Sequence, residues 1–186
     1  NTISQSTMVS NAASYYALYI SASDSNTVSG SYMQNMAGSG ASLQSGADSN
    51  TIIRSTMTSM ATTANRYGLY ISASSSNTVL DSYVQGSTAA FITGSTGTVI
   101  GGSVIIATNV TGHGLYFHAG VNLLLASSTL RGGTAGSAVG LGANVGQIFL
   151  STITVVGGKR GLEVAAPEPG LVLAITSVTL ADLEPA

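Results

Sequence analysis

Apolar residues recur along the chain in pairs that stand five positions apart, with a small residue, usually Ser, between them. This spacing predicts two short strands on either side of a bend, each contributing one inward side chain. Eight such pairs follow one another at intervals of about 24 residues, a period typical of stacked repeat architectures. The pairs are Ile3/Met8, Val28/Met33, Ile52/Met57, Val79/Val84, Val99/Val104, Leu125/Leu130, Ile148/Ile153 and Leu173/Val178.

A third short strand is indicated in most repeats by two apolar residues separated by one position. Alternation by two places both side chains on one face of a strand. Strands of this length, joined by Ser, Asn and Gly turns, bury their inward residues only when coil stacks on coil. The pattern therefore predicts an all-β parallel solenoid of about seven to eight coils with three short strands per coil. The third strands are centred on Leu18/Ile20, Ala41/Leu43, Leu69/Ile71, Ala90/Ile92, Leu115/Phe117, Val139/Leu141 and Leu162/Val164.

The N-terminal half repeats itself at a longer interval as well. The segment "GLYISASSSNTVLDSYV" (68–84) matches "ALYISASDSNTVSGSYM" (17–33) at 12 of 17 positions, which indicates duplication of a two-coil block. One turn position is Asn in four consecutive coils, and stacked Asn side chains can hydrogen-bond to one another. We therefore predict a ladder formed by Asn1, Asn26, Asn50 and Asn77.

The "GLYIS", "SNTV" and "SYV" elements of these units resemble the right-handed parallel β-helix repeat family, which includes pectate lyases, polygalacturonases, tailspikes and many bacterial surface proteins. The resemblance extends over essentially the whole chain and implies a right-handed solenoid. It leaves the activity open, because the family includes lyases, hydrolases, epimerases and scaffolds without activity.

The length of 186 residues is that of one domain, so we expect a single β-helix domain over 1–186, as a segment of a longer secreted or cell-surface repeat protein. Within it, 165–186 is predicted to be the C-terminal coil and cap, because Pro167, Pro169 and Pro185 would stop further strand pairing.

Composition excludes several classes of function. Only 6% of the residues are charged and the net charge is −2, so no basic stripe is present to bind nucleic acid. The chain has no cysteine, which excludes disulfides and thiolate metal sites. No apolar run is long enough for a membrane-spanning helix. No cofactor is expected.

Few polar residues form candidate catalytic or metal-binding groups. Asp24 and Asp48 precede the ladder position in neighbouring coils, so they are weak candidates for a metal site or a carboxylate pair, or alternatively two Asx turns. Arg54 and Asp81 are expected to form an exposed ion pair between coils. Gly112, His113 and Gly114 resemble a polygalacturonase motif, but the acids that accompany it in those enzymes are missing.

An aromatic column is the stronger candidate for a binding site. The outward position between the two apolar residues of the third strand is aromatic in four of the first five coils, namely Tyr19, Tyr70, Phe91 and Tyr116. Such a column can stack on sugar rings, or it can simply stabilise the sheet. The segment between the second and third strands varies most in length, and this corner also carries Tyr67 and His113, which join the candidate glycan-binding set.

Three hypotheses of function follow. The first is a structural spacer or adhesive surface, without catalysis, that contacts polysaccharide or cell-surface glycan through the aromatic column. The second is a polysaccharide lyase or glycoside hydrolase that uses Asp24, Asp48 or His113. The third is self-association through the N-terminal coil into a filament or oligomer.

Overall fold

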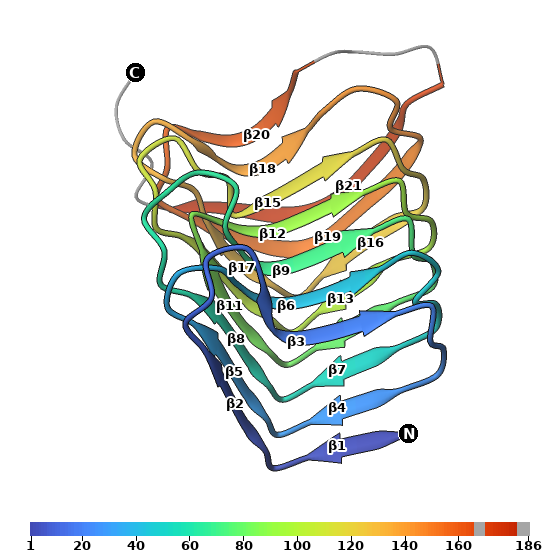
Figure 1. Ribbon diagram of the computed structural model, residues 1–186. Helices are drawn as coiled ribbons and strands as arrows, with labels where there is room; N and C mark the ends of the chain where they lie inside the picture. Colours follow the sequence, from blue (N-terminus) through green and yellow to red (C-terminus); the bar gives the residue numbers. More distant parts are fainter. Residues whose placement is uncertain (166–169, 182–186) are drawn as a thin grey trace.

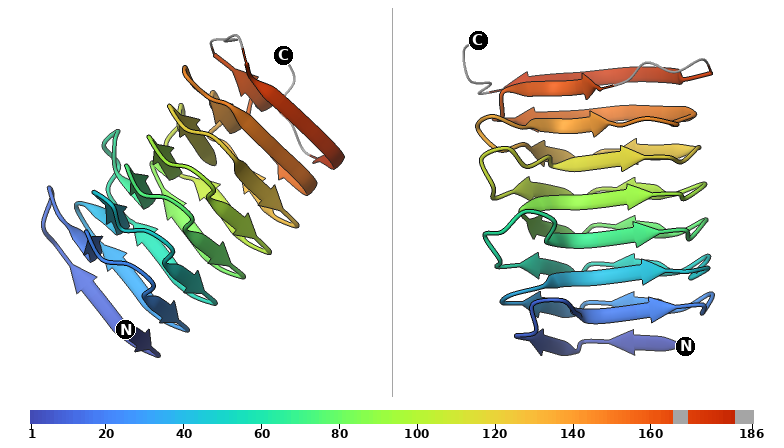
Figure 2. Two further views of the ribbon diagram at one scale, coloured as in Figure 1. Left: turned by 90° about the vertical axis from the view of Figure 1, so that its right-hand side faces the viewer. Right: turned by 45° about the horizontal axis from the view of Figure 1, so that its top comes forward.

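The computed structural model describes residues 1–165 and 170–181, which form short parallel strands stacked coil on coil (Figure 1). Strands β1 to β3 make the first coil, β19 and β20 the seventh, and β21 stacks on β19. Seen from the side, the coils lie one above another as separate layers (Figure 2). The predicted all-β parallel solenoid with about seven to eight coils is confirmed.

Two arms of short strands meet at a bend and together form a 14-stranded sheet, because β19 and β21 run through both arms. The first arm contains β1 (Thr2–Ser4), β4 (Thr27–Ser29), β7 (Thr51–Ile53), β10 (Thr78–Leu80), β13 (Val99–Gly101) and β16 (Leu123–Ala126). The second arm contains β2 (Thr7–Ser10), β5 (Tyr32–Asn35), β8 (Thr56–Ser59), β11 (Tyr83–Gly86), β14 (Val104–Ala107) and β17 (Thr129–Arg131). The long strands are β19 (Gln147–Val156) and β21 (Val172–Ala181).

A separate seven-stranded parallel sheet closes the solenoid and carries the predicted aromatic column. Its strands are β3 (Tyr16–Ser21), β6 (Ser39–Gln44), β9 (Tyr67–Ser72), β12 (Thr88–Thr93), β15 (Leu115–His118), β18 (Ser137–Leu141) and β20 (Arg160–Val164). The registers place all seven predicted third-strand pairs on top of one another. Between the sheets, inward side chains such as Ile52, Leu69 and Phe117 form one continuous core.

A ladder of serines lines the bend between the two arms. The Oγ atom of each Ser donates to the carbonyl oxygen two residues earlier. In every coil after the first it also accepts the backbone N–H of the Ser in the preceding coil, as when Ser82 Oγ donates to Leu80 O (2.7 Å) and accepts from Ser55 N (3.2 Å). The residue before each Ser has positive φ, which makes the bend two residues long. The ladder consists of Ser6, Ser31, Ser55, Ser82, Ser103 and Ser128.

The predicted Asn ladder is present at the opposite turn. Asn1 Nδ2 donates to Asn26 Oδ1 (3.0 Å), and Asn26 Nδ2 donates to Asn50 Oδ1 (2.9 Å). At the next step the backbone N–H of Asn50 donates to Asn77 Oδ1 (2.9 Å). The first four coils are thus tied to one another by side-chain amides as well as by strand pairing.

The sequence-based register is wrong in three of the eight coils. In the fifth coil the inward pair is Ile100/Ile105 rather than Val99/Val104, because Val79 pairs with Ile100 and Val84 with Ile105. In the last two coils Leu150/Val155 and Ile175/Leu180 continue the column of Leu125/Leu130, in place of Ile148/Ile153 and Leu173/Val178. These strands are apolar on both faces, so alternation alone does not fix which residues point inward.

Two smaller expectations have different outcomes. Arg54 and Asp81 form no ion pair, since the only salt bridge among the described residues joins Arg160 and Glu163. Both residues instead occupy the bend at positive φ (48° and 49°). In the predicted C-terminal coil, β21 is regular, whereas Pro167, Pro169 and Pro185 lie outside the described residues.

The corner between the second and third strands varies in length, as predicted. Residues 60–66 separate β8 from β9, whereas Ser87 alone separates β11 from β12. The bend between the arms is always two residues long where it separates two strands. Unequal loops therefore rise only along one edge of the seven-stranded sheet, and they form the walls of the site described next. In the part of the chain that the structure describes, no helix could span a membrane.

Candidate functional site

Aromatic rings stack along the outer face of the seven-stranded sheet. Tyr70 pairs with Phe91 and Phe91 with Tyr116 in adjacent strands, as the sequence predicts. The ring centroids of Phe91 and Tyr116 are 5.5 Å apart with an interplanar angle of 25°, and those of Tyr70 and Phe91 are 5.8 Å apart. Tyr19 lies two coils below Tyr70, because Ser42 interrupts the column.

A second file of side chains runs beside the first, at the beginning of the same strands. Here Tyr67 stacks on Phe91 with centroids 4.9 Å apart, and His113 approaches Tyr116 at 4.8 Å. The two files meet in one aromatic surface that crosses β9, β12 and β15. Because the rings largely pack face to face, their edges and polar atoms are what this surface offers to a ligand.

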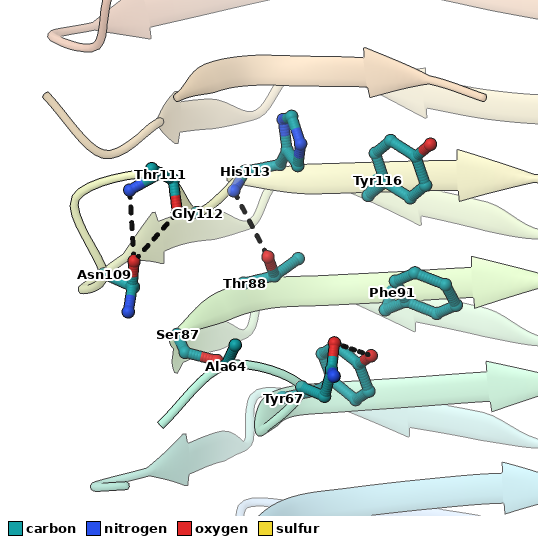
Figure 3. Close-up of a pocket in the computed structure, with 11 residues that line it drawn as sticks. Ala64, Tyr67, Ser87, Thr88, Phe91, Asn109, Thr111, Gly112, His113 and Tyr116 are labelled. Carbon is teal, nitrogen blue, oxygen red and sulfur yellow. Dashed lines mark hydrogen bonds between the residues drawn. The ribbon is translucent and has the colours of Figure 1, made fainter. Parts of the chain in front are cut away.

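A hollow of about 270 Å³ lies between this surface and the unequal loops (Figure 3). Its floor is the aromatic surface, and its walls come from the loop before β9 and the loop before β15. The single-residue connection at Ser87 leaves the space between these two loops open. We call this space the main hollow; it is lined by Ala64, Asn65, Tyr67, Ser87, Thr88, Phe91, Asn109, Thr111, Gly112, His113 and Tyr116.

Hydrogen bonds fix the two loops. Asn109 Nδ2 donates to the carbonyl oxygen of Thr62 (3.2 Å), which joins the loops across the hollow. Asn109 Oδ1 accepts the backbone N–H of Thr111 (3.1 Å). At the sheet, the backbone N–H of His113 donates to Thr88 Oγ1 (3.3 Å) (Figure 3). The walls are therefore held in place by the chain itself.

His113 is the titratable group of the main hollow. Its Nδ1 atom is buried and has no hydrogen-bond partner among the described residues. Burial lowers the pKa of its imidazole below the ordinary value of 6.5, although the charge of Glu163 acts in the opposite direction. The imidazole is accordingly neutral at pH 7, and its buried Nδ1 atom is closed to solvent.

A second, smaller hollow of about 150 Å³ lies on the other side of Asn65 and Tyr67. It is lined by Ala13, Ser14, Tyr15, Tyr16, Ser39, Asn65, Arg66, Tyr67 and Tyr70. Since Asn65 and Tyr67 line both, the two hollows are neighbours along the solenoid axis.

Comparison with known families gives a match over residues 1–135 to the family described as right handed beta helix region. This chain is a right-handed β-helix. The match covers more than half of the chain, and it confirms both the family and the handedness that the sequence elements implied.

Solved structures share the architecture of this β-helix. A mutant of the periplasmic alginate epimerase AlgG superposes with a TM-score of 0.67 at 15% identity, covering 95% of this chain and 45% of that one. The A-module of the mannuronan C-5 epimerase AlgE6 of Azotobacter vinelandii gives a TM-score of 0.52 at 10% identity, covering 100% of this chain and 58% of that one. The β-helix thus spans about half the length of these structures. Comparison with curated protein sequences gives no match.

A pair of charged residues lies on β20 of the β-helix, next to Ser137 on β18. Ser137 Oγ donates to Glu163 Oε2, and Arg160 Nη1 donates to Glu163 Oε1 (3.3 Å). The Ser137 hydrogen bond and then the Arg160 charge hold the pKa of the Glu163 carboxyl below its ordinary value. Glu163 continues the outward column of Tyr116 and Gly140, but its partner Ser137 becomes visible only in three dimensions.

Asp24 and Asp48 serve the turns of the β-helix. Asp24 Oδ1 accepts the backbone N–H of Asp48 (2.9 Å), and Asp48 Oδ1 accepts that of Ser75 (2.6 Å). No group of three or more potential metal ligands occurs among the described residues. Both carboxylates therefore bind the backbone of the next coil, rather than a backbone N–H of their own turn as an Asx turn would.

The predicted binding residues converge only in part. Tyr67, Phe91, Tyr116 and His113 all line the main hollow, and Tyr70 lines the smaller one. Tyr19 lines neither and is 54% exposed at the end of the column. Sequence reasoning missed Ser87, Thr88 and Thr111. Their only signal in the sequence is their position: Ser87 is the shortest connection between a second and a third strand, Thr88 follows it, and Thr111 lies in one of the longest.

Proposed function

We propose that this β-helix binds a polysaccharide along the outer face of its seven-stranded sheet, with the main hollow as the central contact. The observation that carries the proposal is the convergence of three aromatic rings, a neutral imidazole and hydroxyl and amide side chains in one open hollow. Apolar ring edges beside hydrogen-bonding groups match the mixed surface of a sugar.

The shape of the site supports a chain rather than a single small molecule. The coils repeat at about 4.8 Å, the spacing of paired strands, so equivalent positions recur along the axis at roughly the length of one sugar residue. The two hollows are neighbours in the same direction. A polysaccharide lying across the strands would meet both.

The comparisons support this reading of the surface. The similar structures are named as epimerases of alginate and mannuronan, both polysaccharides, and one is named as periplasmic. By analogy we propose an extracellular or periplasmic location for this protein. At 10–15% identity the likeness itself is one of fold.

The test is a screen of the purified protein against immobilised glycans, with calcium and with EDTA, scoring retention and release of fragments. The informative variant is Phe91→Ala combined with Tyr116→Ala, and the matched control is Phe149→Ala. Phe149 is exposed on β19, in the other sheet and away from both hollows. We expect retention of a polysaccharide to fall about tenfold or more in the double variant and to persist in the control.

Other outcomes change the conclusion. Equal loss in the control, or retention unaffected by the double variant, would place binding elsewhere on the surface. Release of fragments would show catalysis. His113, Tyr116 and His118 would then be the residues to replace, since their rings lie side by side on β15 and just before it.

A further inference from the structure

One wall of the main hollow is held by a single hydrogen bond. We call residues 61–64 of this wall the strap. Met60 and Arg66, just outside its two ends, are bonded to neighbouring coils through their backbone. Between these two anchors, the bond from Asn109 Nδ2 to Thr62 O (3.2 Å) is the only hydrogen bond that joins the strap to the rest of the described chain.

The packing of the strap adds little to this bond. Its four residues are Ala and Thr, three of them are exposed, and none belongs to the core. The opposite wall, at 108–114, is held far more firmly, because the backbone N–H groups of Thr108, Gly112 and Gly114 all donate to carbonyl oxygens at 2.8–3.0 Å. A segment with few buried contacts and few hydrogen bonds opens at low cost, so any movement of the walls is expected in the strap.

The bond from Asn109 to Thr62 lies outside the repeating pattern of contacts between coils. The other described side-chain hydrogen bonds between coils join neighbours, with separations from 20 to 30 residues. The separation here is 47 residues, because the bond passes over the fourth coil, where Ser87 alone connects two strands. It can therefore break without disturbing the stacking of the coils.

The donor of this bond is held in position by the firm wall. Asn109 Oδ1 accepts both the backbone N–H and the hydroxyl of Thr111, each at 3.1 Å. The side-chain amide has its donor on the other atom, Nδ2, which is thereby directed at the strap. When the bond opens, Asn109 stays in place and the strap is the part that moves.

The strap has open space on both sides. Ala64 lines the main hollow, whereas Ala61 and Thr62 line a further hollow of about 310 Å³, which we call the outer hollow. Asn109 lines both. The strap and Asn109 thus form the partition between the two hollows, and a strap released from Asn109 has room to move away from the main hollow.

We propose that the strap is a gate of the main hollow and that Asn109 is its latch. With the bond to Thr62 formed, the strap stands beside a bound polysaccharide and retains it; with the bond open, the strap moves into the outer hollow and the polysaccharide can leave. This inference rests on the proposed function and adds the regulation of that site. One exposed hydrogen bond favours the latched state by about 2- to 12-fold, so roughly 8–30% of the molecules are unlatched.

The first experiment measures the strap itself, without ligand. In Asn109→Asp the carboxylate still accepts both bonds from Thr111 but has no N–H for Thr62 O. The control is Asn144→Asp, because Asn144 is exposed between β18 and β19, away from the main and outer hollows. By ¹⁵N relaxation dispersion we expect exchange at 61–64 in the wild type. The chemical shifts of these residues should move toward the minor state in Asn109→Asp and stay unchanged in the control.

The second experiment measures release of a polysaccharide retained in the glycan screen. By surface plasmon resonance, Asn109→Asp should raise the dissociation rate about 2- to 12-fold, and Asn144→Asp should leave it within about twofold. The added negative charge acts mainly on the association rate and fades with salt, whereas the loss of the latch persists in high salt. Circular dichroism checks that both variants fold.

The two experiments separate this proposal from the proposed function. If 61–64 show no exchange and the shifts of Asn109→Asp match those of the control, there is no gate, whatever the protein binds. If the strap moves but the dissociation rate is unchanged, the gate is refuted while polysaccharide binding stands. If the glycan screen is silent, the proposed function fails and the gate fails with it, even where the strap is seen to move.

Discussion

Removing one hydroxyl from the middle of the Ser ladder should destabilise the protein measurably. In Ser82→Ala the backbone N–H of Ser55, buried at the bend, loses its only side-chain acceptor, at 3.2 Å. Leu80 O loses one donor but still accepts the backbone N–H of Arg54 (3.0 Å). The dominant cost is therefore a single buried N–H left unpaired, about 1–3 kcal/mol.

The matched control is Ser6→Ala at the first rung. Ser6 Oγ donates to Ser4 O, but no N–H of a described residue donates to Ser6 Oγ, so this change leaves no buried donor unpaired. Urea denaturation followed by circular dichroism should give a loss of about 2 kcal/mol for Ser82→Ala and about 0.5 kcal/mol or less for Ser6→Ala. In thermal unfolding the first figure corresponds to roughly 4–8 °C for a chain of this length. Equal losses in the two variants would refute the view that the ladder stabilises the protein through buried N–H groups.

Three further predictions concern other parts of the fold. Thr98→Val should raise the free energy of unfolding by about 1 kcal/mol, since Thr98 Oγ1 is buried without a partner among the described residues. The control Thr78→Val, on the outer strand face, should change it by less than about 0.5 kcal/mol. Paired urea titrations of the two variants measure both free energies. Gly68→Ala should cost about 1–3 kcal/mol, because its Cβ would come within 2.5 Å of Gln85 O. Gly101→Ala is the control, since the tightest contact of its Cβ would be a flexible Leu80 methyl at 3.1 Å. A shift in melting temperature for Gly68→Ala no larger than that of the control would show that the backbone relaxes. The stabilisation of the folded state by neutral His113 is complete above pH 6.5 and is lost as the pH falls toward the lowered pKa of the folded protein, because the unfolded chain then binds the proton more readily. Wild type should therefore lose more stability between pH 7.5 and pH 5 than His113→Gln. Parallel profiles of stability against pH would contradict the burial of the imidazole.

The sequence predicts the fold where polar and apolar positions alternate cleanly. In the first four coils Thr or another polar residue faces outward at the first strand, so Val28, Ile52 and Val79 have only one orientation available. From Val99 onward the outward column is Val99, Leu124 and Phe149, and the inward and outward faces become chemically alike. The predicted register is therefore wrong in the fifth, seventh and eighth coils, although it is right for Leu125 and Leu130 in the sixth.

The candidate site was predictable as a surface but not as a hollow. Register alone places Tyr70, Phe91 and Tyr116 in one column, because strand pairing in a solenoid follows the repeat. The depth of the site depends on how the loops at 60–66 and 108–114 pack against each other, through contacts such as Asn109 with Thr62. Loop conformation is set by such single contacts rather than by a repeating pattern, so the sequence gives no signal for it.

The two polar ladders also bear on how such a chain can grow. Each rung accepts on one side and donates on the other. Asn50 Oδ1 accepts from Asn26, and the Asn50 backbone N–H donates to Asn77. In the same way Ser55 Oγ accepts from Ser31, and the Ser55 backbone N–H donates to Ser82. The upper surface of one two-coil block is therefore already complementary to the lower surface of its own copy. A tandem duplication inserted between two coils would find every donor and acceptor matched at once, without a compensating mutation. Heritable change can then accumulate at the loop corner, where it alters what the protein binds and leaves the joints between coils intact.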